Sequence, residues 1–382
     1  MRFTKVLISS AVVAAAFTGT TAFAAGPTLS DVLGNSGITV GGAFDVSYDW
    51  ASNDEVFPAI SPAPGITLPG RVFDTENDAF SFHQANISAS KAFAGGVGAT
   101  LNVIAGDDAQ VTGGGDEFDV VQGFVSWSSG NFSAMGGRFV TLAGMEVINP
   151  SGNINAGRSL LFSMQPLVHE GVRASYKVND MMSLSLGLVN QIYAVSESDE
   201  NNTDLGVEAQ IALTPMKNLS VFLTGYSGNE DEGDGGGDGN SANQRSDVVD
   251  LVVNLNVTDA LYLGLNADYF NTEGDDALFG TGGNLESHGV AGYVGFKFMP
   301  KWRVALRSEY VSIDTGTPGD GNVFFRENTF TLAHACTENL EILAEFRHDK
   351  VTGDDDSAIF APIDNAPEDD QYTGTIKAIL KF

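Results

Sequence analysis

The chain has 382 residues, 18% of them charged, and its 49 acids against 19 bases give a formal net charge of −30. This balance excludes a nucleic-acid binder, which would present a basic face, and a hydrophobic share of 43% excludes a wholly disordered acidic chain. A single cysteine excludes a disulfide framework and a multi-cysteine zinc site.

The first residues predict a secretory signal peptide. A positively charged start precedes an apolar run over residues 6–18, and Ala22 and Ala24 are the small residues that a signal peptidase reads. About a dozen apolar residues are too few to cross a bilayer as a helix, which needs about 20. We therefore expect a signal peptide at 1–24 and a short periplasmic segment at 25–37.

From residue 38 onward the chain shows the period of two that is typical of β-strands. In residues 40–50 the even positions, such as Phe44, are mostly apolar, whereas the odd positions, such as Asp45 and Asp49, are polar or small. This alternation places apolar and polar side chains on opposite faces of a strand. In residues 80–91 the apolar parity changes, which predicts a β-bulge. Sixteen such segments begin near residues 38, 80, 97, 118, 131, 169, 183, 204, 219, 246, 261, 287, 302, 326, 340 and 371.

The connections between these segments alternate between short and long. Short connections and long loops at opposite ends are typical of an outer-membrane barrel, and aromatic residues gather at both ends as membrane girdles do. A soluble β-sandwich, the alternative for alternating strands, explains neither sixteen strands of about ten residues nor the girdles. We predict an all-β fold: a transmembrane antiparallel β-barrel over residues 38–382, with short periplasmic turns and long extracellular loops. The long loops are 51–79, 107–117, 140–168, 194–203, 227–245, 272–286, 313–325 and 351–370.

One stretch of the chain resembles a known family. Its motifs are Gly137-Arg138-Phe139, Gly144-Met145-Glu146, Asn153-Ile154-Asn155, Arg158-Ser159 and His169-Glu170-Gly171-Val172-Arg173-Ala174. They resemble the β-barrel porin-2 (OmpL-like) family of bacterial outer-membrane proteins, and the start of the chain around Thr28-Leu29-Ser30-Asp31 fits that family too. The resemblance implies a channel-forming barrel but supplies no substrate.

The polar face of the strands carries many ionisable side chains. Such groups are costly in a packed core and cost little where they line water, and sixteen strands leave an aqueous bore. The bases on the late strands favour either a transverse field at a constriction or a solvated mixed face without a special field. We predict a water-filled channel with a lining and constriction formed by Asp45, Asp49, Arg138, Glu146, Asn153, Asn155, Arg158, Arg173, Arg303, Arg307, Glu309, Glu345, Arg347 and Lys377.

The loop 140–168 differs from the others in its apolar content. Leu160, Leu161, Phe162 and Met164 would give an exposed loop more apolar surface than is usual. One interpretation folds this loop into the bore as a constriction. The other lets it extend the wall or pack on the rim. We favour the inward-folded loop.

The remaining long loops are strongly acidic. They hold about thirty acids against two bases, Arg71 and Arg245. An acidic mouth concentrates cations within about a Debye length, which predicts a cation preference. Acidic runs in two of these loops are weak candidates for Ca²⁺ ligands, but they lack EF-hand spacing and solvated loops are favoured. We expect no metal site and no cofactor; the weak candidates are Asp231, Asp234, Asp354 and Asp356.

Sequence patterns of enzymes are missing, since His169-Glu170 lacks the second His of a zincin and no P-loop or Gly-x-Ser-x-Gly occurs. The sequence predicts a porin of the bacterial outer membrane, a passive diffusion channel for small hydrophilic solutes with cation preference. Its partners would be membrane lipid, solutes and, by analogy with sixteen-stranded porins, two further copies in a homotrimer. The alternative is a non-transporting barrel with a structural, adhesive or divalent-cation-binding role through its acidic loops. A weaker third hypothesis is a substrate-specific uptake channel.

Overall fold

The computed structural model of the protein describes residues 36–52, 60–63, 66–193, 205–231, 243–274, 283–314, 322–353 and 370–382. The chain divides into two compact units, residues 1–39 and 40–382, and only residues 36–39 of the first are described. The predicted signal peptide at 1–24 therefore lies outside the described residues, as does the predicted periplasmic segment up to residue 35.

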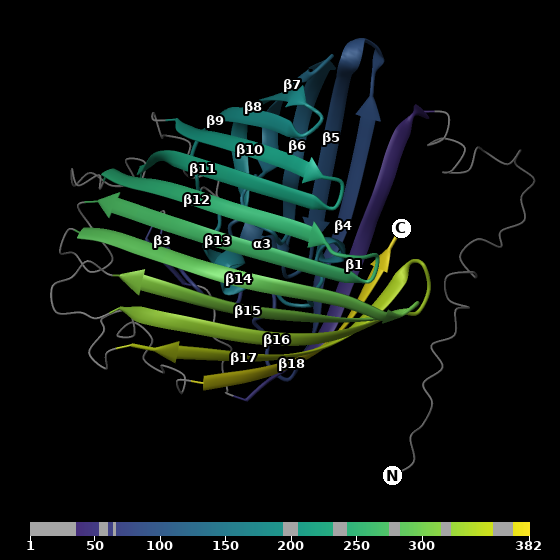
Figure 1. Cartoon of the computed structure of the whole chain (residues 1–382), viewed down its shortest axis with the longest axis vertical. Helices are drawn as coiled ribbons and strands as arrows, with labels where there is room; N and C mark the ends of the chain where they lie inside the picture. The colour runs from purple at the N-terminus through teal and green to yellow at the C-terminus, as the bar shows by residue number, and fades with distance from the viewer. Residues whose placement is uncertain are drawn as a thin grey trace, which may run out of the picture. The chain divides into compact units, whose positions relative to one another are not determined.

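Within the described residues, sixteen antiparallel strands form one closed barrel (Figure 1). Strands that follow one another in sequence are neighbours, and the first and last strands pair, with Phe44 opposite Leu380. The strands are β1 (Ile38–Ala51), β4 (Ala79–Ala92), β5 (Val97–Ala105), β6 (Phe118–Ser129), β7 (Phe132–Val140), β8 (Val168–Asn179), β9 (Met182–Val189), β10 (Gly206–Met216), β11 (Leu219–Asp231), β12 (Asn243–Asn256), β13 (Leu261–Gly274), β14 (Gly283–Met299), β15 (Trp302–Asp314), β16 (Val323–Ala335), β17 (Leu340–Thr352) and β18 (Asp370–Lys381).

The predicted fold class is confirmed. Each predicted strand begins within four residues of an observed one, and the largest difference separates 287 from Gly283. The remaining elements are a separate pair of strands and four short helices: β2 (Ile60–Ala63), β3 (Ile66–Leu68), η1 (Ala94–Gly96), α3 (Ala109–Thr112), η2 (Pro150–Gly152) and α4 (Leu160–Met164). In the described part of the chain no helix is long and apolar enough to cross a membrane.

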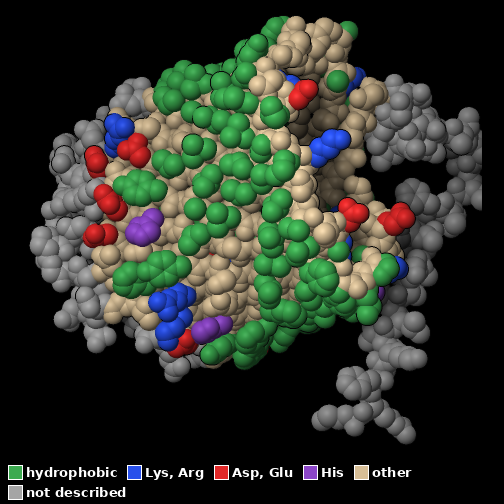
Figure 2. Space-filling view, in the orientation of Figure 1, with side chains coloured by type: hydrophobic (Ala, Val, Ile, Leu, Met, Phe, Trp, Pro, Cys, Tyr) green, Lys and Arg blue, Asp and Glu red, His purple; other side chains and the backbone are tan. Residues whose placement is uncertain are grey.

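The alternation in sequence becomes the two faces of the barrel wall. On β18, Thr373 and Thr375 are buried inside, whereas Tyr372 and Ile376 are exposed on the outside. The outer face is covered by apolar side chains (Figure 2), as a wall in contact with lipid requires. In β4 the parity changes where His83 and Gln84 are both buried, as predicted for residues 80–91.

Short turns lie at one end of the barrel and long connections at the other (Figure 1). Between β6 and β7 the turn is only Gly130-Asn131, and Gly130 has a φ of 58°, a conformation that favours glycine in a two-residue hairpin turn. The long connections include 141–167 between β7 and β8, which carries η2 and α4.

Part of the barrel interior is apolar. Inward side chains of β11–β16 pack around α4 in one cluster that includes Leu160, Leu161, Met164, Tyr226, Val248, Phe270, Val311 and Phe325. A second cluster joins Phe73, Ile148 and Phe162 to Ile104 and Val121 on β5 and β6. The apolar run that set this connection apart in sequence therefore packs against the inner wall.

Candidate functional site

The connection 141–167 contacts inward side chains of strands far along the chain. The amide N–H of Leu160 donates to Glu309 on β15 (2.8 Å). The amides of Ala156 and Gly157 donate to the Glu345 carboxylate on β17 (2.6 and 2.8 Å). These contacts place the connection inside the barrel, against the wall formed by β15–β17.

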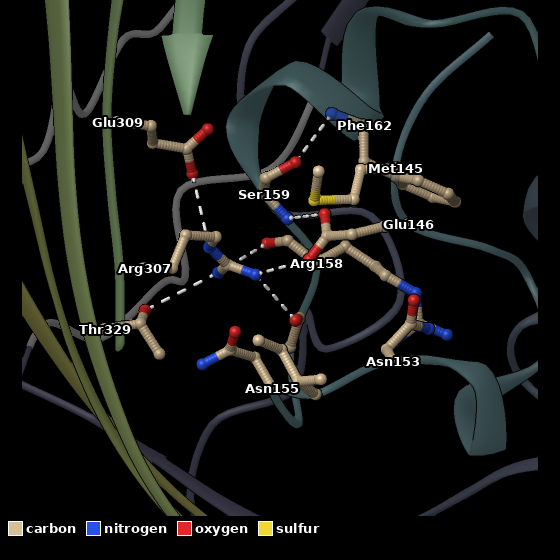
Figure 3. Close-up of polar contacts among 12 residues, drawn as sticks. Met145, Glu146, Asn153, Asn155, Arg158, Ser159, Phe162, Arg307, Glu309 and Thr329 are labelled. Carbon is tan, nitrogen blue, oxygen red and sulfur yellow. Dashed lines mark hydrogen bonds and ion pairs between the residues drawn. The ribbon is translucent and has the colours of Figure 1, made fainter. Parts of the chain in front are cut away.

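Arg307 lies at the centre of this contact (Figure 3). It is 1% exposed, and its Nη1 donates to Glu146 (2.7 Å) and to the carbonyl of Gly157 (2.9 Å). Its Nη2 donates to the carbonyl of Arg158 (3.0 Å), and its Nε to Glu327 on β16 (3.1 Å). A buried guanidinium is tolerable only with such complete pairing. Arg307 therefore joins the connection to the wall.

Arg347 on β17 holds the same turn of the connection. Its Nη1 donates to the carbonyl of Arg158 (2.6 Å), so that this one carbonyl accepts from both arginines of the wall. The fork of Arg347 also binds Asp349, with Nη2 2.6 Å from Oδ1. The side chain of Arg158 itself donates back into its own connection, to the carbonyl of Ile148 (2.9 Å). Arg158 thus shapes the turn that Arg307 and Arg347 bind.

A second set of contacts ties both arms of the connection to β11–β13. The hydroxyl of Tyr226 accepts from the amide of Leu142 (2.7 Å). Asn266 accepts from the amide of Met145 (3.1 Å), while Gln165 donates to Asp268 (2.6 Å). The beginning and the end of the connection are therefore fastened at the same place on the wall.

Two buried carboxylates face each other at this place. Asp250 on β12 and Asp268 on β13 are directly opposite in register and are 0% and 5% exposed. Nδ2 of Asn266 donates to both, at 2.8 and 3.0 Å. Oδ2 of Asp250 has no hydrogen-bond partner in the structure as described, and no base of the described residues forms an ion pair with either acid. Like charges directly opposite in a sheet are unfavourable, so ionisation of both acids at once is disfavoured at the second attachment.

Other predicted lining residues are also buried in pairs. Lys377 binds Asp45 (3.0 Å), and Arg173 binds Glu208 (2.5 Å). Thr375 donates to Asp49 (2.6 Å). The expectation that these charges line water is wrong for this group, because the charges are removed from water and neutralised by neighbours. The bases of the late strands are paired with acids, as Arg307 is with Glu146 and Arg303 with Glu341, so the structure favours neither of the two alternatives drawn from the sequence, a transverse field or a solvated mixed face.

The remaining predicted residues differ in their surroundings. Asn155 donates to Thr331 on β16 (2.7 Å), and Arg303 contacts Glu341 (3.2 Å) and the carbonyl of Ile154. Among the described residues, Asn153 bonds within its own connection, to Val147 and to the carbonyl of Asn149.

Arg138 lies away from the others. It is opposite Glu170 in register and pairs with this residue, whose side chain is 57% exposed, and with Asp119. Opposed residues share a face of the sheet, and Glu170 shares its face with the exposed Val172. The structure therefore does not bring Arg138 to the predicted constriction.

A second connection, residues 69–78, also lies inside the barrel and was not predicted from the sequence. Gly70 donates to Ser163 of α4 (3.1 Å), and Arg71 pairs with Asp74 and donates to Thr373 on β18 (2.6 Å). Burial by itself would raise the pKa of Asp74, but the positive charges of Arg71, Arg347 and Lys377 hold it below its usual value of 3.8. The sequence did contain a signal for this buried connection, because Arg71 is one of only two bases among the acidic long loops.

The inner wall of β7–β10 is different in character. Near the short turns it carries small polar side chains, among them Ser133, Ser175, Ser183 and Thr214, around an open cavity of about 350 Å³. None of the described contacts of the connection 141–167 reaches these four residues. The inner wall of β7–β10 is thus open and lined by hydroxyl groups near the short turns, whereas farther along the same strands Arg173 and Glu208 form a buried ion pair.

The structure describes no metal site. No three His, Cys, Asp or Glu residues of the described ranges are grouped to hold a metal ion. Of the weak Ca²⁺ candidates, Asp234, Asp354 and Asp356 lie outside the described residues, as does the side chain of Asp231.

Comparison with known proteins gives a family match and similar folds. The family model described as Putative beta-barrel porin-2, OmpL-like matches residues 37–382. The sequence matches no curated protein.

Several solved structures share the architecture. A loop L8 deletion mutant of OmpT, an outer membrane protein of Vibrio cholerae, has a TM-score of 0.60 at 10% identity, over 90% of this chain and 99% of that chain. An anion-selective porin from Comamonas acidovorans has a TM-score of 0.58 at 10% identity, over 90% and 99%. The outer membrane channel DcaP of Acinetobacter baumannii has a TM-score of 0.55 at 14% identity, over 90% and 97%. At these identities the likeness concerns the fold alone.

Proposed function

Because the chain belongs to the family described as Putative beta-barrel porin-2, OmpL-like, we propose that it is a passive diffusion channel for small hydrophilic solutes with a preference for cations. The family and the similar outer-membrane structures place the protein in the outer membrane. The observation that carries the proposal is a closed sixteen-stranded barrel with an apolar outside and an interior rich in polar groups, the architecture of water-filled porins.

The open side of the interior supports a route for solutes along β7–β10. The cavity there is lined by serine and threonine hydroxyls and by Lys177, which is 55% exposed. Hydroxyl groups can both donate to and accept from a passing solute. The packed connection 141–167, to which Gln210 of β10 donates at the carbonyl of Leu142 (3.1 Å), would narrow the bore beyond this cavity and set the size limit.

The proposed cation preference depends on where the charges lie. The long loops hold most of the chain's excess acid, whereas inside the barrel the bases are paired with acids. The fold by itself does not decide whether a channel prefers cations or anions, since the similar porin from Comamonas acidovorans is described as anion-selective. The acidic loops would therefore act as the selective element at the mouth.

Single-channel recording in a planar bilayer under a KCl gradient tests the proposal. We expect discrete openings and a reversal potential of cation-selective sign that weakens at high salt, because salt screens exposed charges. Openings with an anion-selective reversal would refute the cation preference alone.

One observation favours the alternative, a barrel that does not transport. The charged residues of the β15–β17 wall are almost completely buried beneath the connection 141–167, with Arg307 and Arg347 each 1% exposed. Absence of conductance from folded barrels, together with conductance after deletion of residues 148–158, would show that this connection closes the bore.

Assembly into a homotrimer is the remaining proposal on partners. One similar structure, of OmpT from Vibrio cholerae, is described as a trimer form. Light scattering of the detergent-solubilised protein should give the mass of three chains. A single-chain mass in several mild detergents would contradict a trimer.

A further inference from the structure

Two basic side chains lie side by side on the outer surface of the barrel. Arg326 on β16 and Lys350 on β17 are directly opposite in register. Both point away from the lumen, because the neighbouring Glu327 and Asp349 are buried inside. Like charges directly opposite each other destabilise a sheet, so a negatively charged group bound to this pair would be stabilising.

The contacts on the described residues compensate only one of the two bases. Lys350 binds Asp370 on β18 (3.0 Å). Arg326 forms no ion pair with any described residue, and its guanidinium lies 5.8 Å from the ring centre of Tyr310. An exposed guanidinium in such a place retains its planar set of donors for an anion.

The strand register gives the depth of the pair in the membrane. Three successive outward rows cross β15–β17, and they change from apolar to polar to basic: Leu306, Phe330 and Phe346; then Ser308, Asn328 and His348; then Tyr310, Arg326 and Lys350. Four residues along a strand cover about 13 Å, or about 10 Å in height at the usual tilt. Tyr310 of the same row and Tyr372, opposite His348 in the row before, are outward aromatic residues of the kind that mark a membrane interface. We therefore place the two bases at the level of the lipid headgroups.

The outward positions on the neighbouring strands are mostly acidic or polar. Across β12–β15 one outward row contains Asp247, Asn271, Glu286 and Asp314, and the next row toward the long loops pairs Arg245 with Glu273. Arg245 is the one base of these two rows, and it pairs with Asp247. Basic side chains gather beside a histidine at the long-loop end of the barrel (Figure 2). The chain has only 19 bases against 49 acids. Two adjoining bases at headgroup depth therefore form a local positive site that favours binding of an anion.

We propose that Arg326 and Lys350 bind a phosphate group of a lipid in the outer leaflet of the membrane. The long loops lie on the extracellular side, so the lipid is a phosphorylated glycolipid of that leaflet. Its phosphate accepts charge-assisted hydrogen bonds from both side chains and removes their mutual repulsion. This inference does not depend on whether the barrel conducts.

Native mass spectrometry of the full-length protein in a neutral detergent tests the site. The probes are diphosphoryl lipid A, lipid A without phosphates and inorganic phosphate. Replacing both bases (Arg326→Gln with Lys350→Gln) should weaken binding of diphosphoryl lipid A at least about tenfold, the scale of one lost charged hydrogen bond. Lys217→Gln, a change of an exposed base in the turn between β10 and β11, should have no effect.

Two results would overturn the proposal. One is equal binding by the double variant and the native chain. The other is competition by inorganic phosphate at the lipid concentration, which would mean a site for a free anion.

Thermal unfolding gives a second readout that a purely structural role would not produce. In neutral detergent without lipid, Arg326→Gln should keep or raise the Tm, because the like-charge repulsion is gone while Lys350 retains Asp370. Diphosphoryl lipid A should raise the Tm of the native chain more than that of the variant. An equal loss of Tm by the variant with and without lipid would contradict the proposal.

Discussion

At the scale of single residues, the interior of the barrel depends on a few fully paired charges. Arg307 has acceptors for its Nε and both terminal nitrogens, shared between Glu146, Glu327 and the backbone carbonyls of Gly157 and Arg158. A lone charge at this depth would be strongly unfavourable, whereas a paired one is tolerated. The effect of the paired Arg307 is to hold the connection 141–167 in place, although this connection is far away in sequence.

A double-mutant cycle between Glu146 and Arg307 measures this attachment. Arg307→Gln leaves buried acids without their cation and should lower the free energy of unfolding by about 3–5 kcal/mol. Glu146→Gln should lower it by about 1–3 kcal/mol, and the double variant by less than the sum. Urea unfolding in micelles measures all three, with the exposed Arg245→Gln as a control that changes little. Strict additivity would mean that the two groups do not interact.

Asp74 predicts a pH dependence of stability. Its pKa is below the usual 3.8 in the folded chain, so its ionised form stabilises the fold above that pH, and the contribution is lost as pH falls toward the folded pKa. Asp74→Asn should therefore lower the Tm by a constant amount between pH 5 and 8. The difference from the native chain should shrink below about pH 4. A difference that persists unchanged at pH 3 would rule out the charge as its cause.

At the scale of elements, strands could be predicted from sequence and the path of the connections could not. A period of two is a local signal, and it located each strand start within four residues. The contact between Glu146 and Arg307 spans 161 residues, and no local period encodes it. Alternation correctly placed Asp45 and Arg347 on the inner face, but which acid binds which base depends on where residues 69–78 and 141–167 lie.

The paired strands β12 and β13 offer a stabilising change. In Asp250→Asn the new amide nitrogen can replace the unpartnered Oδ2 and donate to Asp268, while Oδ1 keeps its bond from Asn266. Relief of the repulsion should raise the free energy of unfolding by about 1 kcal/mol. Glu208→Gln is the matched control, because it removes the partner of Arg173 and should destabilise the barrel. If both variants lose stability alike, Asp250 and Asp268 do not repel each other in the folded chain.

At the scale of the whole molecule, the barrel separates its charges by location. The ionisable groups of the inner wall are largely paired with one another, the outer wall is apolar, and the unbalanced acids belong to the long loops. The composition alone indicated the excess of acidic residues, and the sequence indicated that they lie in the long loops. The pairing inside required the structure, because it rests on contacts between distant parts of the chain.

The proposed preference for cations depends on the distribution of charge over the whole molecule. Replacing Asp354, Asp355 and Asp356 by Asn should reduce the cation-selective reversal potential without altering the fold. The reduction should be larger at 0.1 M than at 1 M KCl, because the Debye length falls from about 10 to about 3 Å. Bilayer recordings with both salt gradients measure it. A reversal potential equal to that of the native chain at low salt would place the selective charges elsewhere.

The partners of the connection 141–167 also set an order of events during assembly. The connection leaves β7 early in the chain, but Glu309, Glu345 and Arg347, to which it binds, lie on β15 and β17. Contacts between such distant parts form late and slowly. The curved sheet must therefore be nearly complete, and its first and last strands close to meeting, before the interior can be filled. A barrel that closed before residues 141–167 had docked would have a wider bore than the folded protein.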